Sequence, residues 1–228
     1  MTSIALTSIT AGALVHYLAT RRNRIGRDEG EGTVVRLSAW DRLLHAGLGL
    51  SFAVLLITGF QASLISGQGL TGYPLLLHCT AGGMYAVCLA LAALTWAEDC
   101  RFQGHDLEWL RHAGGRSTGD RTPAGRLDFL EKILFWLTCL FSLVSLLSIL
   151  LMMTPLFTHP GQEALLEVHR YTALLVVCLA VVHGYRTTIW KSGAWRILVS
   201  GRVGNRWARH YHALWLERIE KKDESSKT

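Results

Sequence analysis

The chain has 228 residues, of which 50% are hydrophobic, and its mean hydropathy is +0.26. The apolar residues fall into long blocks, a pattern that excludes an ordinary soluble domain and indicates a multi-pass membrane protein. The formal net charge of +6 is carried by the segments between the blocks, so it indicates membrane topology rather than nucleic-acid binding.

The first apolar stretch, residues 2–20, is slightly shorter than a full span and rich in Ser, Thr and Gly. Its arginine cluster follows the stretch, whereas a secretory signal carries its positive charge in front. We therefore expect residues 1–38 to form an N-terminal anchor helix and a basic cytoplasmic connection. An amphipathic segment lying on the membrane surface is the alternative.

Four further apolar blocks, each about twenty residues long, are predicted transmembrane helices. They cover residues 43–62, 75–97, 133–154 and 165–189. The connections 61–74 and 155–167 contain no Lys or Arg, whereas the other connections and the tail are basic. The positive-inside rule then places the basic segments and the C-terminus in the cytoplasm. The predicted fold is all-α, with a four-helix membrane domain over residues 39–192 and a cytoplasmic interfacial tail over residues 193–228.

Four of the ten histidines lie inside the predicted spans, where an ionisable side chain is costly and therefore a functional candidate. His45 lies near the cytoplasmic end of its span, and His78 lies near the outer end of the next. His169 and His183 are fourteen residues apart in the last span, on one helix face and about 21 Å apart along its axis. Depth therefore pairs His78 with His169 at the outer level and His45 with His183 at the inner level.

Two imidazole pairs at two depths are suited to two haems, because neutral imidazole is a common ligand of haem iron. No cysteine belongs to a C-x-x-C-H motif, so such haems would be bound non-covalently. Glycines beside the histidines provide room either for a porphyrin or for close helix packing. The other histidines are expected to be solvated or interfacial: His16, His105, His112, His159, His210 and His212.

Three arginines flank the two ligand levels and are candidate partners of haem propionates. They are Arg42, Arg170 and Arg186. For Arg42 and Arg186, anchoring at the cytoplasmic interface explains the charge equally well. Arg170 lies outside the cytoplasmic segments, so a specific acidic partner is expected for it.

The last third of the chain carries the most distinctive local pattern. It contains Val168-His169, Val182-His183-Gly184-Tyr185, Trp190, Gly193, Gly201, Trp207-Ala208, His210, His212 and Trp215. With Asp106–Leu110, Gly125–Lys132 and Phe135-Trp136, this pattern resembles the cytochrome b (gamma) subunit of membrane-bound respiratory formate dehydrogenase. More broadly, it resembles the bacterial cytochrome b561 and nickel–iron hydrogenase cytochrome family, from about Trp40 to Ile219.

The resemblance implies two b haems ligated at His45, His78, His169 and His183. It also implies a menaquinone or ubiquinone site on the cytoplasmic side, where the family uses the inner ligand, here His183, and an asparagine. Asp128 replaces that asparagine, and the bulky Phe129 and Leu130 follow it. A direct contact of Asp128 with the quinone is therefore in doubt, and Asp128 or Glu131 is expected to relay protons instead.

The resemblance further implies a bacterial cytoplasmic-membrane location, with an iron–sulfur subunit and a periplasmic catalytic subunit as partners and a higher oligomer of the complex as an option. This chain would supply electron transfer and a quinone pocket, with no catalytic residue for the primary substrate.

Two alternatives stay open. One is the cytochrome b subunit of a hydrogenase, thiosulfate reductase or other molybdoenzyme. The other is a colourless proton-coupled transporter that uses its intramembrane histidines as relays.

Overall fold

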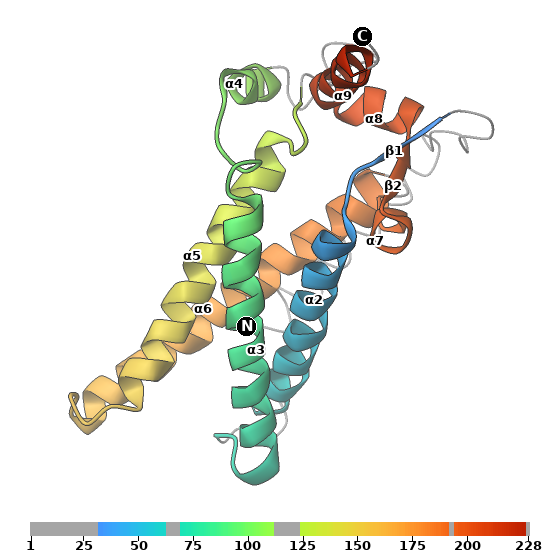
Figure 1. The fold of residues 1–228 in the computed structure, drawn as a ribbon. Helices are drawn as coiled ribbons and strands as arrows, with labels where there is room; N and C mark the ends of the chain where they lie inside the picture. The colour runs from blue at the N-terminus through green and yellow to red at the C-terminus, as the bar shows by residue number, and fades with distance from the viewer. Residues whose placement is uncertain (1–31, 63–68, 112–123, 192–193, 227–228) are drawn as a thin grey trace. The chain divides into compact units, whose positions relative to one another are not determined.

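The computed structural model describes residues 32–62, 69–111, 124–191 and 194–226, which are mostly helical (Figure 1). The long helices are α2 (Ala39–Phe60), α3 (Gly72–Trp96), α5 (Phe129–Met152) and α6 (His159–Tyr185). The shorter elements are β1 (Thr33–Val35), α4 (Gly104–Arg111), the π-helical turn η2 (Arg186–Trp190), α7 (Arg196–Ser200), β2 (Arg202–Gly204), α8 (Asn205–Tyr211) and α9 (Ala213–Ser225).

The four predicted spans are confirmed. Within the described residues, four helices are long and apolar enough to cross a membrane: α2, α3, α5, and α6 continued by η2 as far as Trp190. Each begins a few residues before its apolar block, and at α2 a capping box accounts for the earlier start. Before α2, the Ser38 hydroxyl accepts from the Asp41 N–H, and the Asp41 carboxylate accepts from the Ser38 N–H. The expected helix at residues 2–20 lies outside the described residues.

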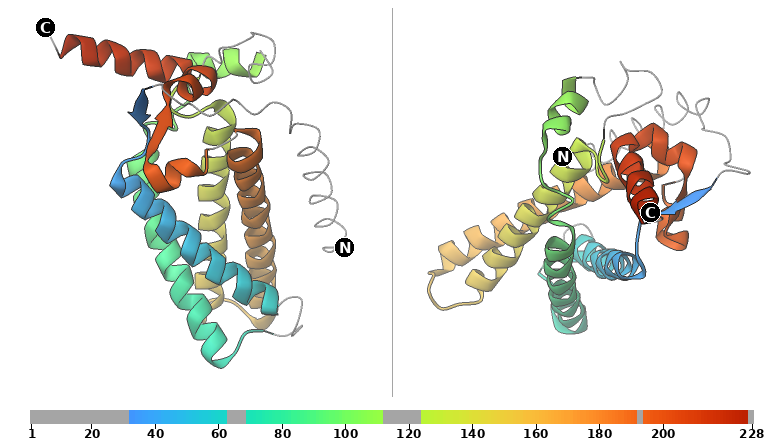
Figure 2. Two further views of the ribbon diagram at one scale, coloured as in Figure 1. Left: turned by 90° about the vertical axis from the view of Figure 1, so that its right-hand side faces the viewer. Right: turned by 45° about the horizontal axis from the view of Figure 1, so that its top comes forward.

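The chain divides into two compact units. The first, the span unit, comprises the described residues 37–62, 69–103 and 129–180 and holds α2, α3, α5 and most of α6. Within it, α2 and α3 pack side by side along much of their length (Figure 2). A Cβ on Gly47 would lie 2.9 Å from Cys88 Sγ, so this glycine allows the close approach of α2 to α3.

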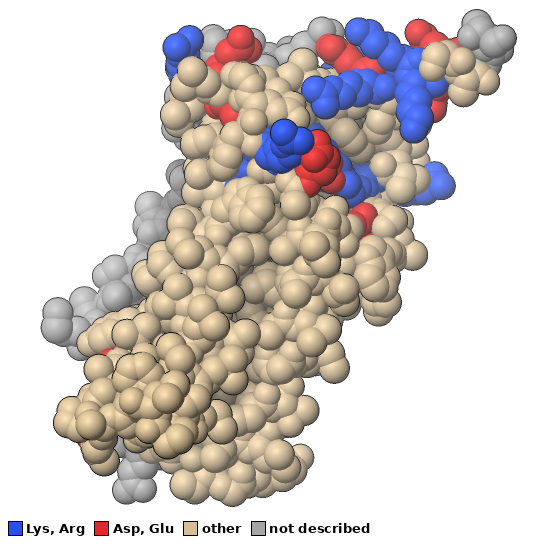
Figure 3. All heavy atoms as spheres, turned by 60° about the vertical axis from the view of Figure 1, so that its left-hand side comes forward, with Lys and Arg blue, Asp and Glu red and all other residues tan. Residues whose placement is uncertain are grey.

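The buried positions of the spans are mainly small and polar: Ser51, Thr58, Ser142, Ser145, Ser148 and Thr172. Large apolar side chains face outward instead, as in Leu50 and Leu94, which are 72% and 81% exposed. Charged residues are almost absent from the face of the long helices in the space-filling view (Figure 3). This arrangement suits lipid, because membrane helices associate through small residues and have no water-driven apolar core.

Within the described residues, the second unit, the terminal unit, is formed by residues 32–36, 104–111, 124–128, 181–191 and 194–226. Here β1 and β2 pair antiparallel, with Val34 opposite Val203, a feature that the all-α prediction did not include. The Arg36 guanidinium donates to the Arg126 carbonyl at 2.9 Å and lies over the ring of Trp207, 5.0 Å from its centre. The segment before α2 is thereby tied to the C-terminal segment.

Candidate functional site

The structure brings together one of the two predicted histidine pairs. His78 on α3 and His169 on α6 both belong to the span unit, and their ring centres are 6.4 Å apart with the ring planes at 72°. These are the two residues that depth along the spans assigned to the outer level.

Each of these imidazoles is held at Nδ1 by a residue of a neighbouring helix. The Thr58 hydroxyl donates to the Val54 carbonyl at 2.8 Å, so its oxygen accepts from His78 Nδ1 at 2.7 Å. His169 Nδ1 lies 3.0 Å from the Ser145 carbonyl oxygen, which can only accept. Both rings therefore carry their proton on Nδ1 and present the lone pair of Nε2.

This donor set fits haem iron. A ligating histidine usually donates its other ring N–H to a carbonyl or hydroxyl, which fixes the tautomer. With their ring centres 6.4 Å apart and Nδ1 of both rings engaged by neighbouring helices, His78 and His169 would hold haem iron through Nε2.

The two inner-level histidines belong to different units. His45 lies on α2 in the span unit, with its ring centre 6.1 Å from that of Trp96. The Trp96 indole N–H donates to Asp41 Oδ1 at 2.7 Å, which fixes the ring that faces His45. His183 lies on α6 within the terminal unit. The pairing of His45 with His183 stays a prediction.

Asp128 lies in a buried cluster of charges in the terminal unit. Its Oδ2 accepts from Arg186 at 2.7 Å and from Lys191 at 2.8 Å, and its side chain is only 3% exposed. The π-turn η2 explains this convergence, because the Lys191 N–H bonds to the Arg186 carbonyl five residues earlier. The two side chains therefore reach the same carboxylate.

His212 extends this cluster. Its Nε2 lies 3.0 Å from Lys191 Nζ, which can only donate, so its Nδ1 carries the proton and donates to the Gly125 carbonyl at 2.8 Å. Burial, followed by the charges of Arg36 and Lys191, holds the pKa of His212 well below its ordinary value. The prediction that His212 is solvated or interfacial was wrong, because the residue is 0% exposed and lies inside the terminal unit. We call Asp128, Arg186, Lys191 and His212 the Asp128 cluster.

The remaining predicted site residues have other neighbours. Arg170 pairs with the exposed Glu167 one turn earlier on α6, which gives it an acidic partner. The Arg42 N–H bonds to the Ser38 carbonyl at 3.2 Å in the first turn of α2. Glu131 lies in the first turn of α5, next to the buried Lys132, whose ammonium donates to the Arg101 carbonyl at 2.9 Å. Their contacts with propionates or quinone stay predictions.

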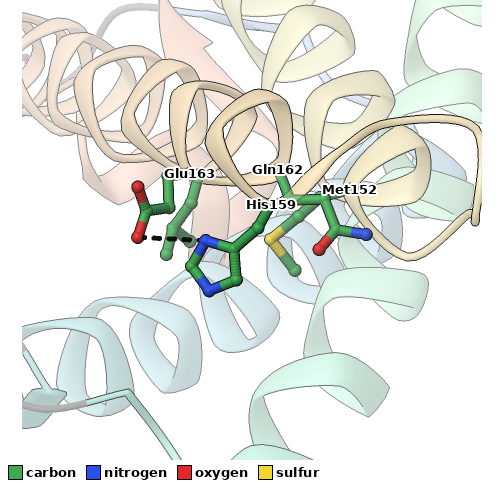
Figure 4. A pocket seen from close by; sticks show the side chains of 5 residues that line it. Met152, His159, Gln162 and Glu163 are labelled. Atoms are coloured by element: carbon green, nitrogen blue, oxygen red, sulfur yellow. Dashed lines mark ion pairs between the residues drawn. The ribbon is translucent and has the colours of Figure 1, made fainter.

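A small pocket lies between the end of α5 and the start of α6 (Figure 4). It is lined by Met152, His159, Gln162, Glu163 and Leu166. His159 and Glu163 form an ion pair at 3.4 Å, and both are well exposed. The pocket contains none of the predicted ligands.

Comparison with known proteins agrees with the resemblance seen in the sequence. The family model of prokaryotic cytochrome b561 matches residues 36–201, and the chain belongs to this family. The family implies haem b.

Three formate dehydrogenase subunits are among the relatives. The cytochrome b556(fdo) subunit of formate dehydrogenase from Escherichia coli K12 is 25% identical over 207 residues, which cover 84% of this chain and 96% of that protein. The nitrate-inducible cytochrome b556(Fdn) subunit of the same organism is 24% identical over 206 residues, covering 82% and 92%. The cytochrome b556 subunit from Haemophilus influenzae is 25% identical over 139 residues, or 58% of each chain.

Proposed function

We propose that this member of the cytochrome b561 family is the membrane cytochrome b subunit of a formate dehydrogenase-like respiratory complex in a bacterial cytoplasmic membrane. It carries electrons from a periplasmic iron–sulfur and catalytic side to quinone at the cytoplasmic side. The observation that carries the proposal is the His78–His169 pair, with a ring spacing of 6.4 Å and with Nε2 of both rings available to a metal. The formate dehydrogenase relatives support the choice of complex.

The chain's own residues account for the electron path. We assign His78 and His169 to an outer haem and His45 and His183 to an inner haem. Haem iron, when bound, supplies a one-electron carrier that cycles between the ferric and ferrous states. His169 and His183 both belong to α6, fourteen residues apart in the sequence, so this assignment gives α6 one ligand of each haem.

The cytoplasmic end of α6 supplies the electrostatics for quinone reduction. His183 is followed three residues later by Arg186, which shares Asp128 with Lys191. Two cations therefore face one carboxylate in this cluster, a balance that favours a negative charge developing on a nearby quinone oxygen. We assign Asp128 the task of holding these cations in place, and Glu131 that of proton delivery.

Difference spectra of the purified chain test the haem assignment. We expect the wild type to show a b-type spectrum with two haems per polypeptide, and His78→Ala and His169→Ala each to lose the outer one. His159→Ala is the matched control, because it removes an exposed histidine of the same helix. Absence of a Soret band in the wild type, or full haem content in both ligand variants, would contradict the proposal.

The partner enzyme requires a separate test. The complex purified from its native membrane through a tag on this chain should show haem reduction on addition of formate, and added quinone should then reoxidise the haem. Reduction by hydrogen or by another donor, with no response to formate, would instead assign the chain to a hydrogenase or a different molybdoenzyme.

A further inference from the structure

We propose that Thr58 and Ser145 are positioning residues that set the electron-donating strength of the two outer imidazoles and so hold the reduction potential of the outer haem low. The inference rests on the proposed function, because it needs haem at the His78–His169 pair. It assigns a role to two hydroxyl residues that lie within apolar helices and take no part in ligation.

Thr58 belongs to α2, whereas the ring that it holds belongs to α3. It is 3% exposed, and its hydroxyl proton is directed at the Val54 carbonyl of its own helix. The Leu55 carbonyl is a second acceptor at 3.2 Å, so the hydroxyl proton has acceptors on its own helix and the oxygen can accept from His78 Nδ1 at 2.7 Å. The bond fixes the rotation of the ring as well as its tautomer.

Ser145 does the same for His169 from α5. Its carbonyl oxygen and its hydroxyl oxygen both lie 3.0 Å from His169 Nδ1. The same carbonyl also accepts from the Ser148 hydroxyl at 2.8 Å. Each outer imidazole is therefore held across a helix–helix interface by a buried acceptor, Thr58 from α2 or Ser145 from α5.

An acceptor at Nδ1 withdraws the proton toward itself and makes Nε2 a better electron donor. A stronger donor stabilises ferric iron more than ferrous iron and lowers the potential of the haem. Removal of the acceptor should therefore raise the potential. Ser145→Ala removes only one of two acceptors at His169, so its effect should be the smaller one.

Redox titration of the α band with potentiometry, together with haem quantitation, tests the inference on the purified chain. At the wild-type midpoint of the outer haem, we expect Thr58→Val to raise the reduced-to-oxidised ratio about fivefold, the equivalent of one lost hydrogen bond. Thr58→Ser should restore the wild-type ratio, because it keeps the hydroxyl. Ser51→Ala is the control, since its hydroxyl lies on α2 and bonds to the Gly47 carbonyl of its own helix.

The outcomes are distinguishable from failure of the proposed function. If Thr58→Val binds both haems and its reduced-to-oxidised ratio equals that of the wild type, the role of Thr58 is overturned and the haem assignment still holds. If Thr58→Val loses the outer haem, retention of that haem at the wild-type potential in Thr58→Ser supports the inference, and its loss in Thr58→Ser overturns it. A wild-type chain without haem would refute the proposed function itself.

Discussion

Substitution of Asp128 by asparagine removes the carboxylate that Arg186 and Lys191 share. All three side chains are at least nine-tenths buried, so the two cations cannot turn to water without opening the terminal unit. Lys191→Met is the matched perturbation, because it removes one cation and leaves the Asp128–Arg186 pair balanced. The structure therefore predicts an asymmetry: loss of the anion should destabilise the protein more than loss of either cation.

The contact distances set the size of this asymmetry. At an effective dielectric constant of 20, and with charge centres about 4 Å apart, each oppositely charged pair in this cluster contributes about 4 kcal/mol before desolvation. Removal of one partner of a buried pair typically costs about 3–5 kcal/mol, because the other charge stays buried. We expect Asp128→Asn to lower the free energy of unfolding by about 5 kcal/mol, because two buried cations lose their shared carboxylate. For Lys191→Met, we expect about 2 kcal/mol, from its lost bonds to Asp128 and His212.

Thermal unfolding in detergent, followed by tryptophan fluorescence, measures the difference. The expected drop in Tm is about 10–20 °C for Asp128→Asn and about 4–8 °C for Lys191→Met. The double variant should be more stable than Asp128→Asn alone, because it strands one cation instead of two. The reasoning is refuted if Asp128→Asn is no more destabilising than Lys191→Met.

Three further predictions concern packing, pH and thiol reactivity. Gly47→Ala should lower the free energy of unfolding by about 1 kcal/mol, because the added methyl group crowds Cys88 Sγ. Adding Cys88→Ala to this variant should restore stability. Gly49→Ala is the control and should be neutral, because a Cβ at Gly49 meets open space. Because the pKa of His212 is lowered from 6.5, the unfolded state binds more protons below pH 6.5. Stability should thus fall by up to about 1.4 kcal/mol per pH unit as the pH drops below that value, and His212→Gln should flatten this slope in chemical denaturation. Burial raises the pKa of the Cys100 thiol to about 12, so the reactive thiolate is scarce at pH 8. Mass spectrometry should therefore find Cys100 unmodified by maleimide in the native protein and modified after denaturation. Labelling of Cys100 to the same extent in the native and the denatured protein would contradict this.

The spans, and the closeness of His78 to His169, could be predicted because both depend on position along a membrane helix, whereas the outer level of this pair stays a prediction. Block length gives the span, and alternating loop charge gives the direction, so the depths of His78 and His169 follow from counting residues. The start of α2 was missed by a few residues, because Ser38 and Asp41 are polar and belong to the helix through capping. Capping is a local rule, and the sequence does contain its signal.

The partners of the site residues could not be predicted in the same way. Thr58 and Ser145 look like ordinary helix-packing hydroxyls in apolar blocks, and their bonds to histidine depend on how neighbouring helices are rotated. His212 lies among charged residues, a composition typical of solvent, yet it is buried through contacts with Lys191 and with the distant Gly125. The strand pair is equally non-local, because β1 and β2 have three residues each and come from opposite ends of the chain.

The haem iron of the oxidised chain offers the most direct test of the central claim, that paired imidazoles hold iron at two levels of the spans. Electron paramagnetic resonance with spin quantitation counts low-spin ferric haem per polypeptide. We expect two low-spin signals of the bis-imidazole type, one of which disappears in His169→Ala. A chain that carries no low-spin haem, or only high-spin iron, would contradict it.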